Sequence, residues 1–381
     1  MTSLTLHLAA AAPAAPPLWR ILTQVGYFGA LALAGGLFLA VAFLLPAAAR
    51  GGAADRALRA LAPYIAAFTA VAAYAQYAGR IARSKLGVSF AESLSPANFG
   101  AYLDLPREKG AWISAAAMAT VQLGLFALAV VLLVVVWRLR GRVAAPVAGA
   151  GFAVVMLAAS APSLTTAVVG MDAAANRVLK LAHILACVVW LGGLFVLAAA
   201  GLRARRSGAD GAGAFERMWV RFSAWAMGAV IAVGVSGLWL TWVHVGSFAQ
   251  FVTTPYGRYL LIKLVLVAGM VAAGVYNVRV LIPAIRRARL AGDEDTVVRL
   301  VLHHFPKVVA AEAVAGIGVL LVVPFLSGSA RKQADGAAAG PFDWETFGIG
   351  ALLVVLLIAA CTAAVRLGAD RPAAAAGAPA A

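Results

Sequence analysis

Long apolar stretches separated by short polar connections dominate the chain. A helix needs about 20 mostly apolar residues to cross the roughly 30 Å hydrocarbon core of a bilayer. By this measure the predicted membrane-spanning helices cover residues 18–45, 57–79, 111–137, 143–161, 176–201, 217–243, 258–283, 304–327 and 344–366. The pattern therefore predicts an all-α polytopic integral membrane protein with about nine transmembrane helices.

The same pattern divides the 381 residues into five parts. These are an N-terminal tail (1–17), an N-terminal transmembrane region of three spans (18–150), a transmembrane core (151–330), an outer loop with the final helix (331–366) and a C-terminal tail (367–381). The loop over residues 80–110 is long enough for a short amphipathic cap or for a plain tether. The last tail is rich in Ala, and we expect it to be disordered.

Composition agrees with a membrane protein, because 63% of the residues are hydrophobic, 12% are charged and the mean hydropathy is +0.92. Soluble domains carry about 25% charged residues. The net charge of +16 comes from Lys and Arg between the apolar runs, and the short basic connections all fall on one side. The positive-inside rule then places the N-terminus outside and the C-terminus in the cytoplasm. We therefore expect the lipid bilayer as partner and no nucleic acid.

The sequence carries no sign of an enzyme or of an ATP-driven pump. It contains no nucleotide-binding motif, no phosphorylatable Asp motif and no CxxC pair, and both cysteines, Cys187 and Cys361, lie inside apolar segments. We expect a protein that is not an enzyme. The oligomeric state stays open.

One histidine lies deep in an apolar run, "LAHILACVVWLGGLFVL", residues 181–197. Cys187 follows His183 one helical turn later on the same face. Imidazole and thiol at this spacing could both bind a soft ion such as Cu(I). Two interpretations of His183 remain open, a ligand and a polar residue bonded to a neighbouring helix, and Cys187 can equally act as a small hydrophobe.

Two further soft ligands are predicted on the outer side. His244 ends the sixth span and Met171 lies in the loop before the fifth. With His183 they form a candidate His/Met site, since thioethers suit copper better than zinc or magnesium. The alternatives are a solvated interfacial histidine and a methionine that only fills space.

Three more polar residues fall within predicted spans, where an ionisable group is costly and often functional. Lys263 lies near the outer boundary and could extend its ammonium outward. Glu312 is deeper, and Asn277 and Arg279 are closer to its depth than Lys263 is. Glu312 could relay protons or lock helices together.

Four motifs in order resemble the CopD-type copper resistance membrane proteins. They are "HILACVVWLGGLFVL" (183–197), "RFSAWAMGAVIAVGVSGLWLTW" (221–242), "TPYGRYLLIKLVLVAGMVAAGVYNVRVLIPAI" (254–285) and "AEAVAGIGVLLVV" (311–323), and the resemblance covers roughly residues 150–327. It implies a protein of the bacterial cytoplasmic membrane that moves copper ions and works with a small extracytoplasmic copper-binding protein. It also favours functional roles for His183, Lys263, Asn277 and Glu312.

The chain departs from this family at one position. The family pattern has Gly-His-Ala-Ala in the outer loop, whereas this sequence reads "VVGMDAAAN" with Met171 in place of the histidine. Because methionine binds Cu(I) better than Cu(II), we expect a Cu(I) site, or loss of the site.

Two other functions compete with copper transport. A haem-binding electron carrier could use His183 and His244 as axial ligands, which requires both at one depth. A non-transporting assembly or partner-docking protein would use the polar residues only to hold helices together.

Overall fold

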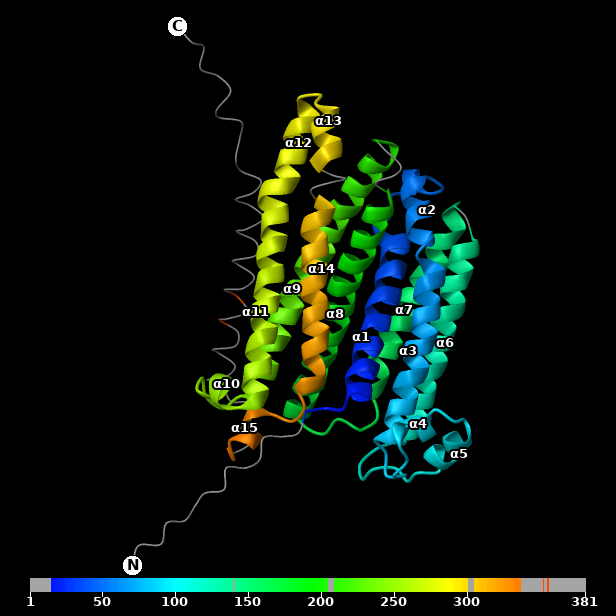
Figure 1. Cartoon of the computed structure of the whole chain (residues 1–381), viewed down its shortest axis with the longest axis vertical. Coiled ribbons are helices and arrows are strands. Elements are labelled where there is room, and N and C mark those ends of the chain that lie inside the picture. The colour runs from blue at the N-terminus through cyan, green and yellow to red at the C-terminus, as the bar shows by residue number, and fades with distance from the viewer. Residues whose placement is uncertain are drawn as a thin grey trace, which may run out of the picture.

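The computed structural model describes residues 15–139, 141–204, 209–300 and 305–336, together with Leu352 and Val355. These residues form a bundle of long helices that run side by side (Figure 1). Within the described residues, 8 helices are long and apolar enough to cross a membrane. The predicted all-α polytopic membrane fold is confirmed. The ninth predicted span, 344–366, lies outside the described residues apart from Leu352 and Val355.

The first four spans form the N-terminal half of the bundle. Its helices are α1 (Leu18–Leu39), α2 (Ala53–Arg59), α3 (Ala62–Ala82), α6 (Ala115–Arg138) and α7 (Ala144–Ser160). A π-helical turn, Ala40–Leu44, extends α1. The other four spans contain α8 (Met171–Ala204), α9 (Ala209–His244), α11 (Pro255–Tyr276), α12 (Ile282–Leu290) and α14 (Phe305–Val322). A π-helical segment, Asn277–Leu281, joins α11 to α12, and α13 (Glu294–Arg299) follows.

Short helices gather at one end of the bundle, which we call the α4–α5 end. They are α4 (Phe90–Ser93), α5 (Ala97–Leu103), α10 (Gln250–Thr253) and α15 (Ala330–Gln333) (Figure 1). The loop over 80–110 is thus a folded cap. Ser89 and Glu92 form a reciprocal capping box, and Phe90 stacks on Trp19 of α1 at 5.0 Å between ring centroids.

α1 is the most buried helix of the N-terminal half and packs against α3, α7 and α8. Small residues make its closest approach possible. A Cβ atom on Gly36 of α1 would collide with the backbone of Gly192 on α8, and a Cβ on Gly192 would meet the carbonyl oxygen of Ala32. Such glycine contacts replace the hydrophobic driving force that is absent between helices in lipid.

The C-terminal half packs more openly. α8 lies beside α9 and α14, and α14 in turn lies beside α11 (Figure 1). Only a small part of α9 and of α11 is buried within the described residues. The apolar side chains on their remaining surfaces, such as Leu238 and Val265, suit contact with lipid.

The start of the fifth span differs from the sequence-based prediction. We expected Met171 in the loop before the fifth span, but it is the first residue of α8 and 80% of it is exposed. Gly170 takes a left-handed φ of 87° and ends the loop there. Asp172 then lies in the first turn, where a negative charge stabilises the helix N-terminus, and the following alanines favour helix.

Candidate functional site

His183 extends from α8 toward α9, where its Nδ1 lies 3.0 Å from Oγ of Ser236. Ser236 is fully buried, and its hydroxyl also donates to the carbonyl oxygen of Ala232 one turn earlier on α9. Because a serine has only one O–H proton, a hydroxyl that donates to a carbonyl must accept from the imidazole. This places the ring proton of His183 on Nδ1 and leaves a lone pair on Nε2, the state in which a histidine binds a metal ion.

Two further residues share this region. Cys187 carries a free thiol one turn after His183 on the same face of α8. Lys263 of α11 lies near enough for its charge to act on both His183 and Cys187. The structure therefore brings three of the predicted residues, from two helices, to one region, with Ser236 of α9 as a fourth member.

Asn277 and Glu312 form a second polar site. The Nδ2 group of Asn277 donates to Oε1 of Glu312 at 2.7 Å, as their similar depth in the sequence led us to expect. Only 7% of Asn277 and 5% of Glu312 is exposed, and Oδ1 of Asn277 is buried without a hydrogen-bond partner among the described residues. Asn277 also opens the π-helical segment, a geometry that often marks functional sites.

The two polar sites lie at different depths. Lys263 and Asn277 are on the same helical run, and at a rise of about 1.5 Å per residue they are roughly 21 Å apart along its axis. A small ion in one site therefore cannot contact the other.

Met171 and His244 lie apart from His183, toward the α4–α5 end. Met171 precedes His183 by roughly 18 Å along α8, and His244 follows Ser236 by roughly 12 Å along α9. His244 stacks on Tyr256 and bonds through Nδ1 to the carbonyl oxygen of Leu240 in its own helix. Since metal–nitrogen bonds are about 2 Å long, these residues do not form one ligand set with His183 in this conformation.

This separation bears on whether His183 and His244 could bind haem and on how many protein ligands a metal ion near His183 would have. Axial haem ligands must face one iron atom from both sides, and His183 and His244 do not lie at one depth. Among the described residues, no group of three or more His, Cys, Asp or Glu side chains could hold a metal ion. A metal ion near His183 would thus have few protein ligands among these residues.

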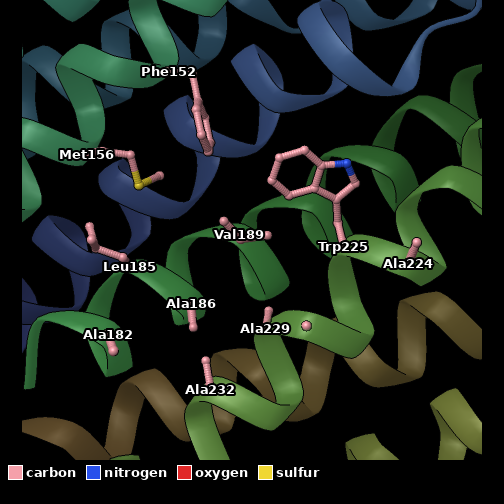
Figure 2. A pocket seen from close by; sticks show the side chains of 11 residues that line it. Phe152, Met156, Ala182, Leu185, Ala186, Val189, Ala224, Trp225, Ala229 and Ala232 are labelled. Atoms are coloured by element: carbon pink, nitrogen blue, oxygen red, sulfur yellow. The ribbon is translucent and has the colours of Figure 1, made fainter. Parts of the chain in front are cut away.

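A pocket of about 560 Å³ opens between α7, α8 and α9. Figure 2 shows its lining, in which Phe152 and Met156 of α7 and Trp225 of α9 surround alanines and aliphatic residues of α8 and α9. Apart from the thioether of Met156, the lining offers no soft or ionisable ligand. Its α8 residues, such as Ala182 and Val189, lie on a different face from His183. This pocket is therefore separate from the candidate site.

The fold and the buried polar residues define a polytopic α-helical membrane protein with two polar sites inside a helical bundle. Residues 216–326 match the model of the CopD family, described as copper resistance protein D. The match contains Ser236, Lys263, Asn277 and Glu312, and it confirms the predicted resemblance to this membrane copper resistance and transport family. No curated protein and no solved structure matches the chain.

Sequence reasoning missed Ser236. The residue stands in "AVGVSGLWL", a run that is otherwise apolar or glycine, and this isolated hydroxyl was the available signal. It also missed a polar network in the N-terminal half, in which Gln122 of α6 joins Arg80 of α3 to Tyr27 of α1.

Proposed function

We propose that the protein transports copper ions across the bacterial cytoplasmic membrane, in copper uptake or resistance. The family match supports copper as the cargo. The observation that carries the proposal is the hydrogen bond between His183 and Ser236, because it orients the imidazole inside a membrane-spanning helix and, with the ring proton on Nδ1, leaves the lone pair of Nε2 for a ligand.

We assign Cu(I) rather than Cu(II) as the transported form. His183 and Cys187 supply a nitrogen and a sulfur on one helical face, and soft ligands of this kind select Cu(I). With only two such ligands the ion is bound weakly enough to leave again, as conduction requires.

Met171 and His244 act in this proposal before His183 rather than with it. Both lie toward the α4–α5 end, and Met171 is exposed there. Each offers one soft or borderline ligand to an ion that approaches from that side. A small extracytoplasmic copper-binding protein would deliver the ion to this end.

The charge of Lys263 affects how favourably a copper ion binds near His183. Its ammonium acts on the same region as an incoming cation, and two like charges in a low-dielectric interior repel strongly. Copper therefore binds more favourably when the ammonium group of Lys263 moves aside, so Lys263 couples occupancy to a change in its own position.

Asn277 and Glu312 form the next site along the route. An ion that leaves His183 needs a polar group farther across the bilayer, since an isolated charge in hydrocarbon is costly. The Glu312 carboxylate, held by Asn277, supplies a negative charge, and the unpartnered Oδ1 of Asn277 is a further acceptor.

Copper flux into proteoliposomes tests this function. We expect His183→Ala to lower Cu(I) flux by roughly tenfold or more, since even indirect support of a metal ligand is worth 10- to 100-fold. Lys263→Met should lower flux more than it lowers the yield of folded protein. Lys180→Met, an exposed lysine on α8, is the matched control and should change neither.

Normal flux and normal cellular copper accumulation in a well-expressed His183→Ala variant would contradict the proposal. A Lys263→Met variant with full flux but poor yield would show that Lys263 has a purely structural role.

A further inference from the structure

A cluster of three arginines lies at the α4–α5 end of the N-terminal half, outside the region that matches the CopD family. The geometry follows from two antiparallel neighbours, α1 and α3 (Figure 1). Thr23 of α1 lies against Gly79 of α3, where an added Cβ would be 3.3 Å from Thr23 Oγ1. One turn farther toward the α4–α5 end are Arg20 on α1 and Arg83 at the end of α3.

Arg80 is the third member, and its orientation is fixed. Its Nη2 donates to Oε1 of Gln122 at 2.7 Å. Gln122 is buried, and its amide nitrogen donates to the hydroxyl of Tyr27 and to the carbonyl oxygen of Ala158. A buried network spanning α1, α6 and α7 therefore holds this guanidinium in place beside Arg83.

The cluster has no negative partner among the described residues. The ion pairs found among the described residues join Arg59 to Asp55 and Arg289 to Glu216, and neither of them involves the cluster. The carboxylate of Glu92 on α4 instead accepts, through Oε2, from the backbone N–H and the hydroxyl of Ser89, at 2.7 and 2.8 Å. Three positive charges thus gather without a counter-charge, which is unfavourable unless something else supplies one.

Two observations show the effect of this gathering. Partial burial, together with the charges of Arg20 and Arg80, lowers the pKa of Arg83 to about 10, although it remains charged at neutral pH. The Nε donor of Arg20 is buried and has no hydrogen-bond partner among the residues that the structure describes. Both features are expected of guanidinium groups arranged for an anion.

We propose that Arg20, Arg80 and Arg83 bind a phosphate group. Guanidinium groups bind phosphate oxygens through paired, charge-assisted hydrogen bonds. Trp19, beside Arg20, stacks on Phe90 and has the amphipathic ring that favours the membrane–water interface. A phosphate at this level can belong to the headgroup of an anionic phospholipid or to free inorganic phosphate.

The test uses the purified full chain and titrates it with phosphatidylglycerol, and separately with inorganic phosphate, while the thermal unfolding midpoint is recorded. We expect phosphatidylglycerol to raise the midpoint of the wild type. The double variant Arg20→Gln, Arg83→Gln should bind it about tenfold more weakly or worse, as the loss of charge-assisted hydrogen bonds predicts. It retains the Arg80–Gln122 bond, so its fold is expected to persist. Lys109→Gln removes one exposed charge from the same loop and should bind like the wild type.

A second readout separates binding from a structural role. In neutral detergent without lipid, Arg83→Gln should raise the unfolding midpoint because it relieves repulsion, and with phosphatidylglycerol it should gain less than the wild type. Competition by inorganic phosphate would support the site and identify a soluble ligand, and its absence would identify the lipid. Equal responses of wild type and double variant to both ligands, or a lower midpoint of Arg83→Gln in neutral detergent, would overturn the proposal.

Discussion

At the scale of single residues, Ser236 decides what His183 can do. A histidine buried next to an acceptor could carry its proton on either nitrogen. Because the Ser236 hydroxyl is directed to the Ala232 carbonyl, we infer that the imidazole donates from Nδ1 and keeps a lone pair on Nε2. The serine thus plays the orienting part that backbone carbonyls and carboxylates play for histidine ligands elsewhere.

Replacing Ser236 tests this role without touching the proposed ligand. We expect Ser236→Ala to weaken Cu(I) binding by roughly 10- to 100-fold, the usual cost of losing an orienting partner of a metal-binding histidine. Competition with a Cu(I) chelator measures the affinity.

Ser223→Ala is the matched control, because Ser223 also donates to a carbonyl four residues earlier on α9. It should retain wild-type affinity. An unchanged affinity in Ser236→Ala would show that His183 does not depend on this bond.

The residues differ in how far the sequence could predict them. Polarity inside apolar runs was enough to single out His183, Lys263 and Glu312, and similar depth predicted the Asn277–Glu312 contact. Ser236 was not predictable in the same way, because a helical serine usually bonds to its own backbone. The rotation of α9 that points it at α8 comes from packing, which local sequence does not encode.

At the scale of helices, the packing of α1 on α8 joins the two halves of the molecule. Gly36 and Gly192 let the two backbones meet, and α8 carries His183 and Cys187 on the adjoining turns. The sequence pattern located both helices, and the Gly192-Gly193 pair indicated a close approach of another backbone, but local sequence did not show that α1 is the partner. In the structure Gly36 and Gly192 face each other on α1 and α8, and a side chain on either would prevent the two backbones from approaching so closely.

A single methyl group tests this contact. We expect Gly192→Ala to destabilise the protein by about 1–3 kcal/mol, the typical cost of overpacking, because the new Cβ would collide with the α1 backbone at Ala32. The thermal unfolding midpoint in detergent should fall and the yield should drop.

Gly124 of α6 provides the comparison, since no described residue lies within 4 Å of a Cβ built there. Gly124→Ala should be neutral or stabilising by up to about 1 kcal/mol, because alanine favours helix. Equal midpoints for the two variants would show that the close approach is not needed.

At the scale of the whole molecule, charge and architecture point to one arrangement in the membrane. The short helices α4, α5, α10 and α15 lie at one end of the bundle, and α12, a basic segment with Arg286, Arg287 and Arg289, lies toward the other (Figure 1). Such a basic segment belongs on the cytoplasmic side by the positive-inside rule. We therefore propose that the α4–α5 end, toward which Met171, His244 and the arginine cluster all lie, is the outer face.

Cysteine labelling tests this orientation. With Cys187 and Cys361 replaced by Ala, we expect Ser95→Cys in the cap to react with a membrane-impermeant maleimide on intact cells. Ala291→Cys, between α12 and α13, should react only after the membrane is permeabilised. Both positions are exposed, so accessibility alone does not distinguish them. The reverse pattern would place the N-terminus inside and invert the proposed route.

The central claim is that His183 binds a copper ion, and metal content measures it most directly. Purified wild type and His183→Ala protein are incubated with Cu(I) under reducing conditions, and copper content and the absorption spectrum are recorded. The account predicts stoichiometric copper in the wild type, its loss in the variant, and no Soret band in either. Equal copper in both proteins, copper in neither, or a Soret band in the wild type would contradict it.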